Sequence, residues 1–134
     1  MNWFAAHIVL YVELKKQPQD RFPVWENIVL IEATTEDEAF DKAETIGRRG
    51  EGDDEGSFRW EGEPARWVFA GVRKLTACET AERRPGDGTE LTYLQMEVAS
   101  REALERLVDS RPVTVEFEEP FPSDNNSQGE LISQ

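Results

Sequence analysis

The sequence has very few of the residues that build covalent, metal-bound or catalytic sites, with one cysteine, Cys78, and one histidine, His7. A lone cysteine cannot form an internal disulfide or a thiolate metal cage. No Gly-rich phosphate loop and no Gly-x-Ser-x-Gly elbow occurs, so the common nucleotide and hydrolase signatures are absent. We therefore predict no cofactor, no metal site and no catalytic residue.

The chain also lacks a long apolar run and a basic leader, because it opens Met1-Asn2-Trp3 and its first apolar stretch is too short to span a bilayer. Together with the single cysteine, this predicts a cytoplasmic protein. Basic residues are scarce as well: 15 Lys and Arg face 28 Asp and Glu, for a net charge of -13. Such a charge repels nucleic acid and anionic membranes, whereas it suits either a basic protein partner or a merely solvated surface.

The length of 134 residues is typical of one domain. We expect residues 1–121 to form a single α+β domain. Residues 122–134 are rich in Ser, Asn, Asp and Gln and contain no basic side chain, which predicts a disordered acidic tail.

Alternating apolar residues predict five strands. These are Trp3–Leu14, Val24–Ala33, Arg66–Leu75, Glu90–Val98 and Val113–Phe117. The unbroken apolar run from Ile28 to Ile31 indicates that the second strand is covered on both faces and lies near the middle of the sheet. Turn residues between the third and fourth strands predict a second hairpin after that of the first two.

Two helices complete the predicted fold. Thr35 and Glu38 form a capping box before a helix from Glu36 to Ile46, which we expect to pack Phe40 onto the sheet. Ser100 can cap a short second helix that ends before Pro112. The order is strand, strand, helix, strand, strand, helix, strand, so the prediction is a five-stranded, mostly antiparallel sheet with two helices. The glycine-rich, acidic segment 50–64 is predicted to be a loop that Phe58 and Trp60 anchor.

Each predicted strand has one face that carries mainly aliphatic side chains. Several rings fall on the opposite faces, and they form our candidate binding surface. The residues are Trp3, His7, Tyr11, Trp67, Phe69 and Tyr93. If the helices cover the aliphatic side, these rings form a homo-oligomer interface, a ligand groove, or a patch covered by the loop around Phe58 and Trp60. If the helices cover the aromatic side, the same rings are ordinary core.

Two local patterns raise the question of chemistry without settling it. His7 is either a general base or a hydrogen-bonded structural histidine, and pairing it with Cys78 as a nucleophilic dyad needs a spatial coincidence that nothing local predicts. The segment Glu51–Glu63 begins like a calcium-binding loop, but Gly62 stands where the bidentate glutamate is required. A solvated acidic loop is the favoured interpretation.

Three segments in order resemble one known family. The first segment, Trp3-Phe4-Ala5-Ala6, opens the first strand. The second reads Ile-Val-Leu-Ile-Glu-Ala at 28–33 and is followed in the helix by Glu38-Ala39 and Lys42-Ala43. The third, at 66–72, reads Arg-Trp-Val-Phe-Ala-Gly-Val. Over roughly the first two thirds of the chain, the sequence resembles the bacterial family called domain of unknown function 4288. The resemblance implies a small bacterial cytoplasmic protein and brings no assigned activity, substrate or catalytic residue.

Three functions remain open on the sequence. The first is a non-enzymatic interaction module that self-associates through its aromatic sheet face. The second is an acidic, immunity-type inhibitor whose carboxylates cover a basic partner protein. The third is a small-ligand protein or an enzyme that uses His7, Tyr11, Arg66 and Arg73 in a cleft.

Overall fold

The computed structural model describes residues 1–78 and 84–118. The chain divides into two compact units, Met1–Thr92 and Tyr93–Gln134, which are described separately. The expectation of one domain over residues 1–121 stays a prediction, and the expected acidic tail at 122–134 lies outside the described residues.

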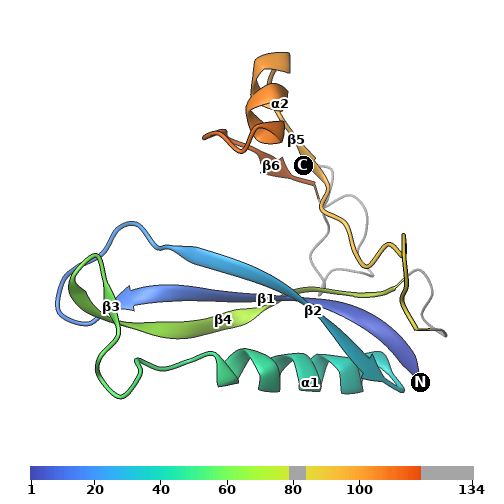
Figure 1. The fold of residues 1–134 in the computed structure, drawn as a ribbon, viewed down its shortest axis with the longest axis horizontal. Coiled ribbons are helices and arrows are strands. Elements are labelled where there is room, and N and C mark those ends of the chain that lie inside the picture. Colours follow the sequence, from blue (N-terminus) through green and yellow to red (C-terminus); the bar gives the residue numbers. More distant parts are fainter. Residues whose placement is uncertain (79–83, 119–134) are drawn as a thin grey trace. The chain divides into compact units, whose positions relative to one another are not determined.

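The first unit is a four-stranded antiparallel sheet with one helix (Figure 1). Its elements are β1 (Asn2–Leu14), β2 (Val24–Ala33), α1 (Glu36–Arg49), β3 (Arg59–Trp60) and β4 (Glu63–Ala77). The strand order is β2-β1-β4-β3, and each pairing is antiparallel. Because β1 lies between β2 and β4, it is the best buried strand of the sheet.

The second unit contains β5 (Met96–Glu97), α2 (Arg101–Val108) and β6 (Glu116–Phe117). β5 and β6 pair as a separate two-stranded antiparallel sheet. The Ser100 side chain accepts a hydrogen bond from the backbone N–H of Ala103 at 3.1 Å, which confirms the predicted cap. α2 has no buried residue.

The prediction of an α+β fold with two helices and antiparallel pairing is confirmed. The prediction of a single five-stranded sheet is wrong, because the strands form a four-stranded and a separate two-stranded sheet. The expected strand Glu90–Val98 is reduced to Met96–Glu97, and the strand Val113–Phe117 to Glu116–Phe117. Residues 90–95 are not part of a strand, so the predicted hairpin between the third and fourth strands is absent from the described residues. Alternation of apolar residues marks a chain that can be extended, but strand pairing also needs a neighbour with a free edge.

Helix α1 begins where the capping signal placed it. The Thr35 side chain accepts from the N–H of Glu38 at 3.1 Å, and a Glu38 carboxylate oxygen accepts from the N–H of Thr34 at 2.8 Å. The helix continues three residues past the predicted end and is capped by Gly50. These contacts satisfy amide groups that a helix start leaves without intrahelical partners.

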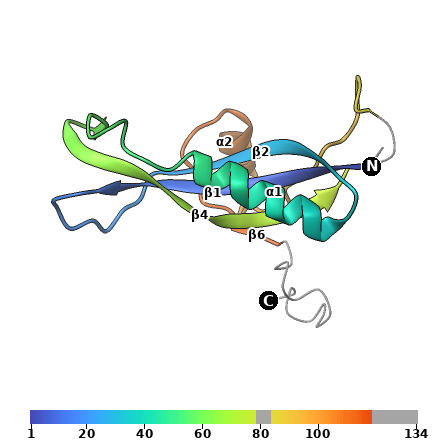
Figure 2. The same ribbon diagram turned by 90° about the horizontal axis from the view of Figure 1, so that it is seen from below.

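The fully buried residues of α1 are small, Ala39, Ala43 and Gly47, and Ile46 packs against the core beside them. Phe40 is 38% exposed, so the prediction that it packs onto the sheet is wrong. Small side chains let the helix axis approach the sheet closely, and Phe69 of β4 fills the space beside Gly47. α1 lies across one face of the sheet (Figure 2).

The core lies between α1 and the aliphatic face of β1. Its buried residues come from β1, β2, β4 and α1: Phe4, Ala6, Ile8, Leu10, Ile31, Ala33, Ala39, Ala43 and Phe69. Burial of such side chains contributes about 1.5–3 kcal/mol each for the large ones, which makes this layer the main source of stability. The helix therefore covers the aliphatic side, the first of the two alternatives that the sequence left open.

Two β-bulges interrupt the pairing of β4 with β1, and together they leave Leu75, Phe69 and Trp67 on one face of the sheet. The register with β1 shifts between His7 and Ile8 and again between Val9 and Leu10. After both shifts Leu10 pairs with Phe69 and Val12 with Trp67, which places these two rings on the α1 face. The prediction that Trp67 and Phe69 share a face with Trp3 is therefore wrong. Gly71, at φ +152°, provides the backbone geometry that the second bulge needs.

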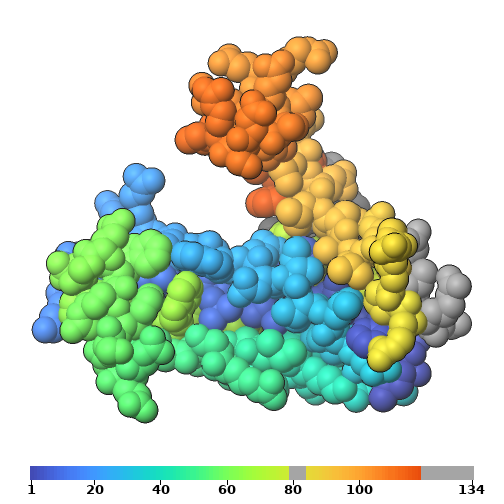
Figure 3. Space-filling view, viewed as in Figure 1, coloured from blue at the N-terminus to red at the C-terminus, as the bar shows by residue number. Residues whose placement is uncertain are grey.

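Strand β2 lies at an edge of the sheet and not near its middle, so that prediction is wrong as well. Ile28 and Leu30 remain 45% and 40% exposed although they belong to an apolar run. The run indicated two covered faces, whereas α1 covers only one of them. In the space-filling view, atoms of β2 lie at the surface above α1 (Figure 3).

Candidate functional surface on the open sheet face

The sheet face opposite α1, here called the open face, carries alternate residues of β1 and β2. Cross-strand partners lie on the same side of a sheet, so the register identifies them. They are Trp3, Ala5, His7, Val9 and Tyr11 of β1 and Val24, Glu26, Ile28, Leu30 and Glu32 of β2. Of the six candidate residues, the structure brings Trp3, His7 and Tyr11 together on this face.

His7 is the polar centre of the open face and is fully buried. Its Nδ1 lies 2.6 Å from Oε2 of Glu26, and its Nε2 lies 2.7 Å from Oγ1 of Thr92. A carboxylate only accepts hydrogen bonds, so Nδ1 carries a proton that it donates to Glu26, while Nε2 is hydrogen-bonded to the Thr92 hydroxyl. Both ring nitrogens are thus hydrogen-bonded.

Glu26 links this histidine to Arg73, the extra residue of the first bulge. Its Oε2 accepts from Nε of Arg73 at 2.9 Å and lies 2.8 Å from Nη2. Partial burial raises the pKa of Glu26, but the hydrogen bonds from Arg73 and His7 outweigh it, so the pKa lies below its ordinary value. Glu26 is therefore an anion at neutral pH that holds two donors in place.

The stabilising effect of Glu26 is expected to disappear in acid. Because its pKa is lower in the folded chain than in the unfolded one, its contribution is present above pH 4.5 and is lost as the pH falls through the folded value. We expect Glu26→Gln to lower the free energy of unfolding at neutral pH, with a gap to wild type that closes on acidification. Urea unfolding between about pH 3 and 7 measures this gap. Glu32→Gln, on the same face of β2, is the control, and a constant gap for Glu26→Gln would contradict the network.

The segment 84–92 reaches two residues of the open face. Thr92 bonds to His7, and the guanidinium of Arg84 lies 5.9 Å from the centre of the Trp3 ring. The turn at 86–89 forms as expected, since the N–H of Thr89 donates to the carbonyl of Gly86 at 3.1 Å. The sequence left open a patch covered by the loop around Phe58 and Trp60, but here the contacts come from 84–92.

The β2 side of the open face keeps large apolar side chains at the surface. Val24 is 57% exposed, and Phe22, just before the strand, is 50% exposed and packs edge-on against Tyr11 at 5.6 Å. With Ile28 and Leu30 they form a row along an edge strand, here called the β2 row: Phe22, Val24, Ile28 and Leu30. Scattered apolar residues are ordinary at a surface, but several on one side of an edge strand, interrupted here by Glu26, indicate an interaction site.

The remaining candidates lie elsewhere or play other roles. Trp67 and Phe69 face α1, and Tyr93 belongs to the second unit. Cys78 is buried, and this burial raises the pKa of its thiol. The Nε2 atom of His7 is hydrogen-bonded to Thr92 and not to Cys78. Arg66 pairs with Glu13 at 2.9 Å. The sequence did not identify Glu26 or Thr92, because no local pattern reports a contact between residues 85 positions apart.

The acidic segment 51–63 is held by its own turns and by aromatic rings. The side chain of Asp53 accepts from the N–H of Gly56 at 3.0 Å and pairs with Lys15, and the hydrogen bond from Lys15 holds the pKa of Asp53 below its usual range. Phe58 stacks on Trp67 and Trp60 contacts Trp25, which confirms the expected anchoring. Within residues 1–78 and 84–118, the carboxylates that converge closely are Glu97, Glu116 and Glu118 of the second unit and not those of this segment.

A family model described as domain of unknown function DUF4288 matches residues 3–92. The chain belongs to this family. The DUF4288 match ends at Thr92, the last residue of the first unit, and includes each partner of His7. The resemblance drawn from the sequence is thus confirmed, and its bacterial origin stays a prediction. Comparisons with curated proteins and with solved structures gave no match.

The DUF4288 description assigns no activity, so the function is unknown at the level of the family. In the part of the chain that the structure describes, neither helix is long and apolar enough to cross a membrane.

Proposed function

We propose that this protein is a non-enzymatic interaction module that self-associates through the β2 side of its open face. The observation that carries the proposal is the β2 row, in which Val24, Ile28 and Leu30 are 40–57% exposed on one side of an edge strand. Burying such a row against a second copy removes apolar area from water at about 25 cal/mol per Å². The sequence-based interface thus moves from its aromatic residues to this aliphatic row, beside Trp3 and Tyr11.

The edge of β2 supports the same proposal. Natural edge strands are usually protected by lysine, proline, bulges or short length. β2 is 10 residues long, contains no lysine, arginine or proline, and pairs with β1 without a register shift. A second copy of β2 is a matching partner, because an antiparallel pair of identical strands gives a closed, two-fold symmetric dimer.

The His7 network favours this function over catalysis. His7 is fully buried and both its ring nitrogens are engaged, so in this arrangement it is not placed to take a proton from a substrate. Its contacts instead join β1, β2, β4 and Thr92 beneath the exposed row. A rigid support of this kind lowers the entropic cost of docking.

Sedimentation equilibrium tests the proposal. We expect the wild type to show an average mass above that of one chain, and Ile28→Gln with Leu30→Gln to shift it to the monomer without loss of thermal stability, because both side chains are exposed. Val108→Gln, which removes a 75% exposed residue of α2, is the matched control. Added salt should strengthen association, since it screens the repulsion between copies of charge -13. A monomeric wild type, or an unchanged mass in the double variant, would contradict it.

A second candidate, the binding of a basic protein, is favoured by a different feature. The carboxylate-rich segment 51–55 is hydrogen-bonded to Trp67, through two backbone bonds between Gly52 and Trp67 of 3.2 and 2.8 Å. Such a site would lose affinity as salt is added, the opposite of the trend expected for self-association.

A further inference from the structure

A small aromatic pocket lies on the α1 side of the sheet, just beyond the end of the helix. It has a volume of about 220 Å³ and is lined by Leu10, Trp25, Asn27, Gly50 and Trp67. Leu10 and Trp25 are cross-strand partners, and Gly50 is the residue that caps α1. Trp25 is 42% exposed, so its ring is open to a ligand.

The rings around this pocket hold one another in place. Trp25 meets Trp67 edge to face at 5.0 Å and 83°, and it meets Trp60 at 5.8 Å and 89°. Phe58 stacks on the other ring of the pair, Trp67, at 5.6 Å and 24°. A cluster of mutually packed rings loses little freedom when a ligand arrives, which favours binding.

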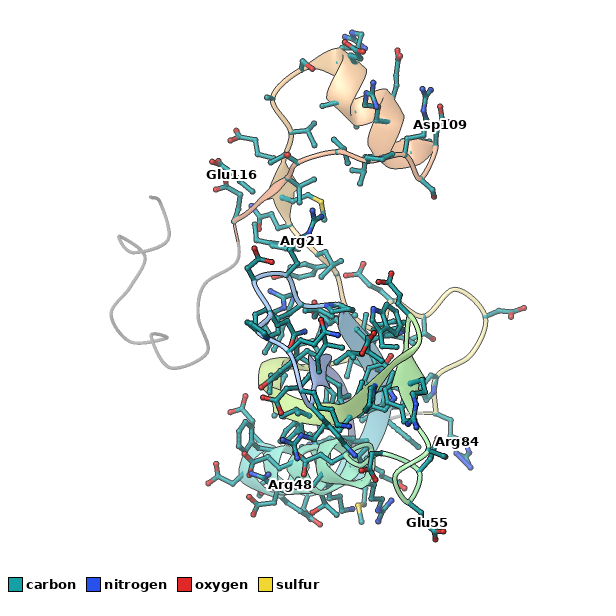
Figure 4. All side chains as sticks on the ribbon, turned by 90° about the vertical axis from the view of Figure 1, so that its left-hand side faces the viewer. Arg21, Arg48, Glu55, Arg84, Asp109 and Glu116 are labelled. Carbon is teal, nitrogen blue, oxygen red and sulfur yellow. The ribbon has the colours of Figure 1, made fainter. Side chains whose placement is uncertain are left out.

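The charges around the pocket favour a cation. The C-terminus of α1 ends at the pocket wall, and from its last turn onward residues 48–55 carry four acidic side chains against the two basic ones of Arg48 and Arg49. The backbone bridge between Gly52 and Trp67 joins the carboxylate-rich segment 51–55, which includes Asp54 and Glu55, to the strand that carries one ring of the pocket. Glu55 stands at the outer end of its loop (Figure 4). Asn27 adds an amide oxygen that can accept from a cationic N–H.

The same region already holds one guanidinium against a ring. Arg48 lies 5.1 Å from the centre of Phe69, and Phe69 is the β4 partner of the pocket residue Leu10. Trp is the best of the aromatic side chains for such contacts, and arginine makes them more often than lysine.

We propose that this pocket receives an arginine side chain from a basic partner protein, with the guanidinium against Trp25 and the flanking carboxylates of the 51–55 segment around it. A volume of about 220 Å³ suits one side chain and is below the usual size of a drug-like site. The pocket and the β2 row use opposite faces of the same strand, so binding at the pocket is read from indole signals and self-association from the sedimented mass, and either can fail without the other.

Indole N–H resonances provide the test, since the chain has four tryptophans and two of them line the pocket. The probe is a short neutral-capped glycine peptide with one central arginine, and the same peptide with citrulline serves as its uncharged isostere. We expect the arginine peptide to shift the signals of Trp25 and Trp67 and to leave that of Trp3 in place. Shifts of equal size with citrulline, or none with arginine, would overturn the proposal.

Variants separate a specific pocket from general attraction to an acidic chain. Trp25→Ala is expected to weaken binding of the arginine peptide at least tenfold. Asp54→Asn with Glu55→Gln should weaken it several-fold, whereas Glu36→Gln with Asp37→Asn removes the same charge at the far end of α1 and should change it less than twofold. Equal effects of the two charge-removing pairs, or full binding by Trp25→Ala, would contradict the assignment.

Discussion

Replacing Gly47 with alanine is expected to lower the free energy of unfolding by about 2–3 kcal/mol. A Cβ at this position would lie 2.3 Å from Cε1 of Phe69, far inside van der Waals contact. Phe69 is only 8% exposed and belongs to the core, so its ring has little room to move. At an exposed helix position, the same substitution would stabilise the helix by about 1 kcal/mol, so the two effects have opposite sign.

Chemical denaturation of Gly47→Ala shows whether the clash with Phe69 or the higher helix propensity of alanine has the larger effect on stability. Thr45→Ala, at an exposed position of the same helix, is the control and should change stability by less than about 0.5 kcal/mol. Adding Phe69→Leu to Gly47→Ala should relieve the clash, so the double variant is expected to lose less than the sum of the single changes. A Gly47→Ala protein as stable as wild type would show that α1 does not pack against Phe69 as described.

Replacing His7 with alanine is expected to cost about 3 kcal/mol. The change removes a buried ring and leaves the Thr92 hydroxyl and one acceptor site of Glu26 without their partner. Arg73 remains beside Glu26, which keeps the carboxylate from becoming an isolated buried charge. Thermal and urea unfolding provide the measurement.

Thr92→Val isolates the far end of the same network. It keeps the shape of the side chain and removes the hydroxyl that bonds to Nε2, so we expect a loss of about 1–2 kcal/mol. If His7 and Thr92 act together, the double variant should lose less than the sum of the two single losses. Strict additivity would mean that Thr92 does not bond to His7 in solution.

The sequence predicted the local features of this fold well. The Thr35 and Ser100 caps, the bounds of β1 and β2 and the turn at 86–89 each follow from residues that contact near neighbours. Along β4, Trp67, Phe69 and Leu75 occupy alternate positions and all pack at the core. These features depend on interactions within a few residues, which is the range that single-sequence patterns report.

What the sequence could not provide was register and order. The pairing of β4 with β1, in which Leu75 lies opposite Ala6 and Phe69 opposite Leu10, decides that Trp67 and Phe69 face α1, and no residue pattern within either strand records that pairing. The apolar run in β2 predicted a central strand, but β2 lies at the edge of the sheet, and its side chains on the face opposite α1 are exposed. The contacts of His7 with Glu26 and Thr92 join residues 19 and 85 positions apart, so the polar centre of the open face emerges only in three dimensions.

Hydrogen exchange along β2 tests the central claim most directly, because an edge strand that pairs with a second copy must protect its outward amides. We expect the amides of Val24–Ala33 to exchange more slowly as protein concentration rises over about a hundredfold range, while those of α2 stay unchanged. Exchange of the β2 amides at one rate across that range would contradict self-association through this strand.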